Sequence, residues 1–212
     1  CIIDKDKLGG ICLNWGCIPT KALLKNAEVY GLVKNASSYG ISIKEIIFNF
    51  KKNVKRSRDV ANRLSKGIEY LIKKNRISHI KGVGEFSSKN NLKIRMSSKT
   101  EMIEANNIII ATGARPSSFP GMEYDQKRII SYKEAMLLET PPKNIIIIGS
   151  GAIGCEFAYY FNEFGSKVHI VEMKNQILPL EDVEVSSEVE KSFNNSGINI
   201  LKKTKVLKIE SQ

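Results

Sequence analysis

The sequence predicts an α/β protein, and two segments carry that prediction. A run of isoleucines over 144–148 precedes a glycine-rich turn and a helical segment, and a second strand-like segment then ends at Glu172. The opening residues 1–5 have the form of the second strand of another such unit, with Asp4 in the position of Glu172. Strands that alternate with helices in this way indicate a parallel sheet. We therefore expect two Rossmann-like units in this chain of 212 residues.

The elements expected along the chain follow from periodicity and turn residues. They are a strand at 1–5, a helix after the glycine loop up to residue 37, a helical stretch over 43–77, strands around 78–86, 92–96 and 101–111, a proline-rich connector over 116–143, and a βαβ unit from 144. The long helix is expected to bury a face formed by Val60, Leu64, Ile68, Leu71 and Ile72. The isoleucine strand predicts a sheet that is covered on both faces.

Composition limits the classes of function. A hydrophobic content of 42% with 26% charged residues is ordinary for a globular protein. The net charge of +11 raises nucleic acid as a partner, but the lysines are dispersed and no aromatic stacking pattern accompanies them. Apolar runs such as 106–113 are too short to cross a bilayer. Four cysteines without a secretory signal argue against a disulfide scaffold.

Three glycines open the helix of the βαβ unit. Gly149, Gly151 and Gly154 form G-x-G-x-x-G directly after a strand, a pattern that cradles a dinucleotide diphosphate at the helix N-terminus. Glu172 follows 18 residues after Gly154, where a carboxylate accepts hydrogen bonds from an adenosine ribose and repels a 2′-phosphate. The pattern therefore predicts a nucleotide site that prefers NAD to NADP, with a merely tight turn as the alternative.

Cys12 and Cys17 stand five residues apart in "LGGICLNWGCIPTKALLK". In a regular helix their Cα atoms would be about 8–9 Å apart, whereas a disulfide needs roughly 7 Å or less. Bridging the pair requires a distorted turn, which Asn14 and Gly16 are suited to make. Pro19 suits the first turn of a following helix, so Cys17 would lie near a helix N-terminus that stabilises a thiolate.

Redox chemistry explains this pair better than its alternatives. Zinc would need more ligands, but His79 and His169 are the only histidines and there is no second cysteine pair, so no metal site is expected. Two inert buried thiols are the other alternative. A dithiol and a nicotinamide both exchange two electrons, and a flavin is the expected intermediary between them.

Three motifs resemble the flavoprotein disulfide reductases (class I pyridine nucleotide-disulfide oxidoreductases), and in detail the dihydrolipoamide dehydrogenases. "LGGICLNWGCIPTKALL" is similar to that family's redox motif, "IIIATGARP" to its second FAD segment, and "GSGAIGCEFA" to its NAD segment. The resemblance covers the chain in the correct order. It implies an FAD-binding domain over 1–115, a connector over 116–143 and an NAD-binding domain over 144–212, with both dinucleotide-binding domains incomplete.

The resemblance also implies roles for individual residues. Cys12 would exchange with the dithiolane of lipoamide, Cys17 would lie against the flavin, Lys21 would stabilise negative charge on the reduced ring, and Glu156 would lie near the nicotinamide. FAD would also contact Asp4, Gly9, Gly10, Gly84, Thr112, Gly113 and Ala114. NAD would contact Gly149, Ser150, Gly151, Ala152, Ile153, Gly154 and Glu172. Cys155 is expected in the core, and Trp15, which replaces an aliphatic residue common in the family, is expected to pack over the redox turn.

The function implied is oxidation of protein-bound dihydrolipoamide to lipoamide through a Cys12–Cys17 disulfide and FAD, with hydride passing to NAD. Its partners would be the lipoyl domains of 2-oxoacid dehydrogenase or glycine-cleavage complexes, and the intact protein would be a homodimer in the bacterial cytoplasm or, alternatively, the mitochondrial matrix. The alternatives are another disulfide reductase or a mercuric reductase, or a basic nucleotide- or nucleic-acid-binding module.

Both ends of the chain are expected to be cut. It begins without methionine and closes on a strand-like segment over 205–211. In the family the first FAD phosphate loop would precede Cys1, and an interface domain with a His–Glu acid/base pair would follow the last residue. We therefore expect a fragment that is inactive by itself.

Overall fold

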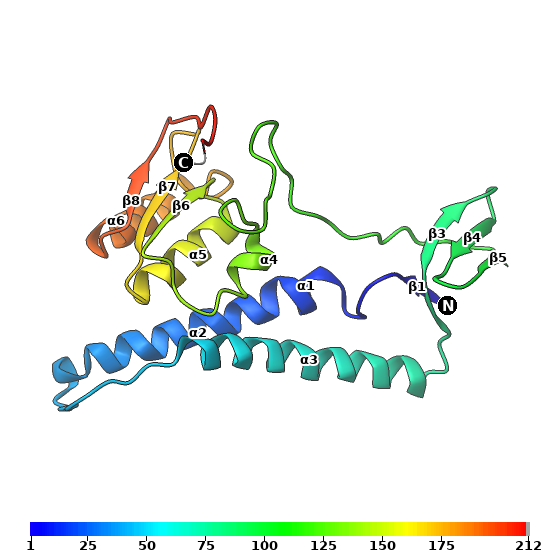
Figure 1. Ribbon diagram of the computed structural model, residues 1–212, viewed down its shortest axis with the longest axis horizontal. Coiled ribbons are helices and arrows are strands. Elements are labelled where there is room, and N and C mark those ends of the chain that lie inside the picture. The colour runs from blue at the N-terminus through cyan, green and yellow to red at the C-terminus, as the bar shows by residue number, and fades with distance from the viewer. Residues whose placement is uncertain (211–212) are drawn as a thin grey trace. The chain divides into compact units, whose positions relative to one another are not determined.

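The computed structural model describes residues 1–210 and divides the chain into two units of interleaved segments (Figure 1). One unit contains Cys1–Pro19 and Arg58–Arg115, and the other contains Thr20–Ser57 and Pro116–Gln212. The predicted domain boundaries at residues 115 and 143 stay a prediction. We call the two parts the redox-turn unit and the glycine-turn unit, after the motifs that they carry.

The redox-turn unit contains two small sheets. β1 (Ile2–Asp4) pairs in parallel with β2 (His79–Lys81). A three-stranded antiparallel meander follows, formed by β3 (Val83–Phe86), β4 (Asn91–Arg95) and β5 (Thr100–Glu104). In this meander Gly84 pairs with Ile94, which is fully buried. The strands predicted around 78–86 and 92–96 are therefore confirmed.

The strand predicted over 101–111 is wrong beyond residue 104. Residues 105–111 are not in a strand, and the side chains of Ile109 and Ile110 are 91% and 70% exposed. An apolar segment of this kind becomes a strand only when a neighbouring strand pairs with it and covers it, and none does so within residues 1–210. The closing strand is also wrong over 205–210, and residue 211 lies outside the described residues.

Two long helices are each divided between the two units. α2 (Cys17–Lys34) is followed by the short 3₁₀ helix η1 (Ala36–Tyr39) and by α3 (Phe50–Lys74). The helix expected over 43–77 thus begins later, because Asn49 caps it: its side-chain oxygen accepts a hydrogen bond of 2.9 Å from the Lys52 amide.

The buried face of α3 differs from the predicted one. Ser57, Ala61 and Ser65 are almost fully buried, whereas Leu64 and Leu71 are exposed. The prediction followed the large aliphatic side chains, but small residues every four positions allow closer packing of neighbouring backbone. Of the predicted face, Ile72 is buried.

The glycine-turn unit is a parallel sheet with helical connections. β6 (Asn144–Ile148), β7 (Lys167–Val171) and β8 (Asn199–Leu201) lie in that order, and α5 (Ala152–Glu163) and α6 (Val183–Asn195) connect them. The side chains of Val168 and Ile170 in β7 are completely buried, as is Phe161 in α5. The predicted βαβ unit is confirmed. The segment before this unit, which was predicted as a connector over 116–143, contains one helical turn, α4 (Tyr132–Ala135). This turn begins with a capping box formed by Ser131 and Glu134.

One face of this sheet is open, which corrects the expectation that both faces are covered. Ile146 and Ile148 of β6 are 65% and 44% exposed. Ile146 is paired with His169 and Ile147 with Ile170, so the exposed and buried side chains alternate across the sheet. The helices therefore cover one face within the described residues, and the isoleucine run is only half buried.

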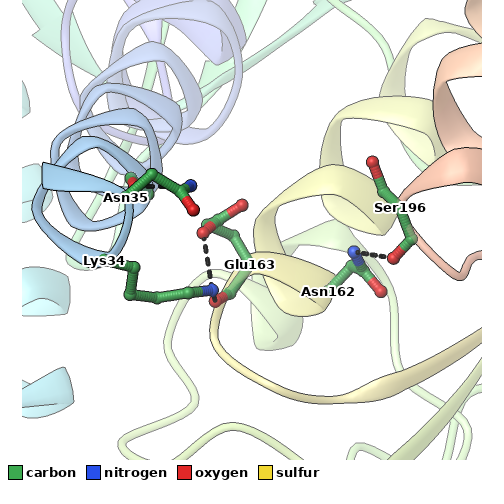
Figure 2. A network of polar contacts seen from close by, with 6 residues as sticks. Lys34, Asn35, Asn162, Glu163 and Ser196 are labelled. Carbon is green, nitrogen blue, oxygen red and sulfur yellow. Dashed lines mark hydrogen bonds and ion pairs between the residues drawn. The ribbon is translucent and has the colours of Figure 1, made fainter. Parts of the chain in front are cut away.

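Polar and aromatic contacts attach the end of α2 to the end of α5. Lys34 Nζ lies 2.9 Å from Glu163 Oε1, and the Tyr30 and Phe164 rings stack with centroids 5.1 Å apart. Figure 2 shows the Lys34–Glu163 pair beside the hydrogen bond of 3.1 Å from the Asn162 amide to the Ser196 carbonyl oxygen. These contacts fix the helix that carries the glycine turn.

An isoleucine on each face of the sheet allows the same substitution to be compared at a buried and at an exposed position. We expect Ile170→Ala to lower the free energy of unfolding by about 2–5 kcal/mol, because it opens a cavity in the core. Ile146→Ala, on the open face, should change it by about 0.5 kcal/mol or less. Urea denaturation of both variants measures the difference. An equal decrease in the free energy of unfolding in the two variants would contradict the conclusion that one face of the sheet is open.

Candidate functional site

The glycine turn between β6 and α5 is closed on its inner side. A Cβ atom placed on Gly154 would lie 2.2 Å from the carbonyl oxygen of Gly149, which no side chain permits. The third glycine of the motif therefore allows the first turn of α5 to pack directly on the loop.

The outer side of the same turn is open. A Cβ atom on Gly149 or Gly151 would meet no atom within 4 Å. Gly151 is the N-cap of α5 and has no side chain to cap the first amides of the helix. These amides carry the positive end of the helix dipole, so the turn suits the diphosphate of a dinucleotide.

Glu172 follows β7 and is held against the glycine turn. Its Oε2 atom accepts hydrogen bonds from the Ser150 amide (2.9 Å) and hydroxyl (2.7 Å), and its Oε1 atom accepts one from the Lys174 amide (2.8 Å). Burial raises the pKa of Glu172, but these hydrogen bonds outweigh it and the pKa lies below its ordinary value of 4.5. The carboxylate is therefore ionised at neutral pH.

Ser150 is the residue that fixes this carboxylate. It is fully buried, and its carbonyl oxygen accepts hydrogen bonds from the Leu178 amide (2.8 Å) and the Cys155 thiol (3.3 Å). Burial raises the pKa of Cys155 to about 11, so this thiol stays neutral and is a core group, as predicted. Sequence reasoning included Ser150 only as part of the motif. The contact with Leu178 has no sequence signal.

The cysteine turn is a break between two helices. α1 (Gly10–Trp15) ends before Gly16, which has φ −132° and ψ −118°, and α2 begins at Cys17. A Cβ atom on Gly16 would lie 3.1 Å from the Cα atom of Cys12, so the chain folds back onto the turn that carries Cys12. Both cysteines are exposed. The distorted turn and the helix that follows it, with Pro19 in its first turn, are confirmed.

Asn14, which the sequence suggested for this turn, stabilises it through hydrogen bonds of its side chain. Its side chain is buried and donates hydrogen bonds of 3.0 Å to the carbonyl oxygens of Leu8 and Gly10. The glycine pair at positions 9 and 10 is thereby joined to the helix that carries Cys12. Gly9 is the N-cap of this helix and Gly10 its first residue.

Lys21 and Glu156 meet in the glycine-turn unit. Lys21 lies one turn after Cys17 in α2, and its ammonium group forms an ion pair with the Glu156 carboxylate of α5. Two residues that the sequence placed separately, near the flavin and near the nicotinamide, are therefore partners.

The other predicted FAD contacts lie in the redox-turn unit. Asp4 stands at the carboxyl end of β1, the position at which an acid binds ribose. Gly84 approaches the same strand, because a Cβ atom there would lie 3.8 Å from Ile3. Thr112, Gly113 and Ala114 form an exposed segment without regular structure. Asp4 and Gly84 therefore both lie at β1, and their contact with an adenosine stays a prediction.

Within residues 1–210 the structure contains neither a metal-binding cluster nor a membrane-spanning helix. No group of three or more histidine, cysteine, aspartate or glutamate side chains lies close enough to hold a metal ion. No helix in this range is both long and apolar enough to cross a membrane.

Known relatives match nearly the whole chain. It is 43% identical over 201 residues to the dihydrolipoyl dehydrogenase of Chlorobaculum parvum, covering 94% of this chain and 43% of that protein. The dihydrolipoyl dehydrogenase of Zymomonas mobilis is 46% identical over 201 residues with the same coverage of both proteins. The chain spans less than half the length of these relatives.

Solved structures agree with this likeness. LpdA from Mycobacterium tuberculosis superposes with a TM-score of 0.90 at 25% identity, over 97% of this chain and 46% of that one. The HOCl-induced flavoprotein disulfide reductase RclA from Escherichia coli gives a TM-score of 0.81 at 27% identity, over 97% of this chain and 44% of that one.

The family description "pyridine nucleotide-disulphide oxidoreductase" matches residues 1–212. The chain belongs to the pyridine nucleotide-disulphide oxidoreductase family.

Proposed function

We propose that this chain is the redox-active part of an enzyme that oxidises dihydrolipoamide to lipoamide and reduces NAD⁺. The observation that carries the proposal is the exposed Cys12–Cys17 turn, in which Gly16 packs on Cys12 and Cys17 opens a helix. The relatives named dihydrolipoyl dehydrogenase support this choice of substrate.

Cys12 and Cys17 form the disulfide that the substrate reduces. One thiolate of dihydrolipoamide attacks the sulfur of Cys12, and Cys17 leaves as a thiolate. The second substrate thiol, after losing its proton, attacks the substrate sulfur of the mixed disulfide and releases the thiolate of Cys12. The products are lipoamide and a reduced cysteine pair, which together have received two electrons.

The position of Cys17 favours its role as the leaving group. As the first residue of α2 it lies at the positive end of a helix dipole, which stabilises a thiolate. FAD, when bound, supplies the two-electron carrier between this pair and the nicotinamide. We assign its contacts to Asp4, Gly9, Gly10, Lys21, Gly84, Thr112, Gly113 and Ala114.

NAD is held by the glycine turn and its acid. Gly149–Gly154 would hold the diphosphate, and Glu172, fixed by Ser150, would accept hydrogen bonds from the adenosine ribose. Glu156, paired with Lys21, would lie near the nicotinamide. In this assignment the ammonium group of Lys21 would stabilise negative charge at the flavin.

Lipoyl domains of 2-oxoacid dehydrogenase or glycine-cleavage complexes are the proposed protein partners, and the intact enzyme is a homodimer of the cytoplasm. The similarity to the flavoprotein disulfide reductase RclA supports a second candidate function, in which the substrate is a disulfide other than lipoamide. The substrate assay below separates the two.

Cys12→Ser should abolish dihydrolipoamide oxidation, because serine cannot form the mixed disulfide. The protein, expressed from its complete reading frame, is assayed for NADH formation and for bound flavin. Flavin content should be unchanged. Cys1→Ser, which removes an exposed cysteine outside the motif, is the control and should retain activity. Full activity in Cys12→Ser would exclude the proposed chemistry, and a wild-type flavoprotein that ignores dihydrolipoamide would favour another disulfide.

Glu172→Gln should reduce the preference for NAD⁺ over NADP⁺ by about tenfold, since it removes the charge that repels a 2′-phosphate and keeps the shape of the side chain. The kcat/KM ratio for the two coenzymes measures this preference. Glu188→Gln, an exposed change in α6, should leave the ratio unaltered. An unchanged ratio in Glu172→Gln would mean that this acid does not select the coenzyme.

A further inference from the structure

Arg58 of α3 caps the helix that carries Cys12. Its guanidinium donates a hydrogen bond to the carbonyl oxygen of Asn14 in the last turn of α1. The last four carbonyls of a helix have no partner within the helix, and this end carries partial negative charge. A guanidinium there satisfies an acceptor and complements the dipole.

The same guanidinium lies over the ring of Trp15. The distance from Arg58 Cζ to the ring centroid is 4.6 Å, within the range of a cation–π contact. The contact is partly shielded from water, and burial lowers the pKa of Arg58 from its ordinary value. Trp15 is the last residue of α1 and the immediate neighbour of Gly16.

A second residue of α3 holds the other side of the turn. Ser65 is buried, and its hydroxyl donates a hydrogen bond of 3.0 Å to the carbonyl oxygen of Leu8. The Asn14 side chain donates to this same oxygen at 3.0 Å. Arg58 and Ser65 are seven residues apart and thus lie on one face of α3.

We propose that Arg58 is a positioning residue for the Cys12–Cys17 couple: by capping α1 and lying on Trp15, it holds the break at Gly16 that places the two sulfurs for disulfide exchange. This inference rests on the proposed function of the cysteine pair. It assigns to α3, which supplies no residue of the redox motif, a direct part in setting the redox equilibrium.

Arg58 would act on the redox equilibrium by keeping the distance between Cys12 and Cys17 fixed. Gly16 packs against the Cα atom of Cys12, so any fraying of the last turn of α1 changes the distance between Cys12 and Cys17. A looser turn lowers the effective concentration of one thiol at the other, and the disulfide becomes less stable relative to the dithiol.

The test measures the dithiol–disulfide equilibrium of the two cysteines in glutathione buffers. The purified protein is quenched by alkylation, and the Cys12 and Cys17 peptides are quantified by mass spectrometry. We expect Arg58→Met to lower the equilibrium constant for disulfide formation by about tenfold, which for a two-electron couple is ~30 mV. Arg58→Lys, which keeps a cation able to reach the carbonyl, should recover part of the loss. Arg63→Met, an exposed change in the same helix, should have no effect.

Trp15 provides an independent readout, because it is the only tryptophan of the sequence. Its fluorescence should change in Arg58→Met while the circular dichroism of the protein is retained. If Arg58→Met does not fold, Trp15→Phe, which keeps an aromatic ring but weakens the cation–π contact, should give a smaller shift in the same direction.

Three results would overturn the inference. An equilibrium constant that equals that of the wild type, with altered Trp15 fluorescence, would mean that the contact exists but does not position the cysteines. Failure of the wild-type cysteines to form a disulfide at any glutathione ratio would remove the proposed function and this inference together. A normal wild-type couple with unaffected variants would remove the inference alone.

Discussion

The close approach of Gly16 to the backbone of Cys12 is the constraint on which the proposed redox site depends. A Cβ atom at position 16 would lie 3.1 Å from the Cys12 Cα atom, so a side chain there would force the backbone at Cys12 to shift, and glycine lets the break between α1 and α2 form without that shift. The break does two things at once. It ends one helix three residues after the first cysteine and begins another at the second. The Asn14 and Arg58 contacts then secure a turn that has little regular structure of its own.

The glycine turn of the other unit also depends on a glycine that allows close packing, but there the packing positions a carboxylate and not a cysteine pair. Gly154 allows the helix to press on the loop, and the loop in turn presents Ser150 to a buried carboxylate. An ionised acid with little exposure is stable there because hydrogen bonds offset its loss of hydration. Both motifs therefore combine a glycine that permits close packing with polar groups that hold the reactive or binding side chain.

The sequence predicted the parts whose signals are local. The glycine motif, the acid that follows the second strand and the cysteine turn each depend on residue types at short spacing, and the structure contains these elements. The buried face of α3 was mispredicted because its contacts are made by Ser57, Ala61 and Ser65, whose small size carries no hydrophobic pattern. The isoleucines of β6 and of 105–111 were misassigned for a related reason: whether an apolar strand is covered depends on segments distant in sequence. The Arg58–Trp15 contact, 43 residues apart in the chain, has no sequence signal of either kind.

The central claim is that Cys12 and Cys17 are one redox couple that dihydrolipoamide reduces. The most direct measurement is differential alkylation of the purified, oxidised protein before and after one equivalent of dihydrolipoamide under anaerobic conditions. The account predicts that Cys12 and Cys17 are protected together before the addition and become alkylated together after it, while Cys155 does not change. Alkylation of either cysteine that is independent of dihydrolipoamide would contradict it.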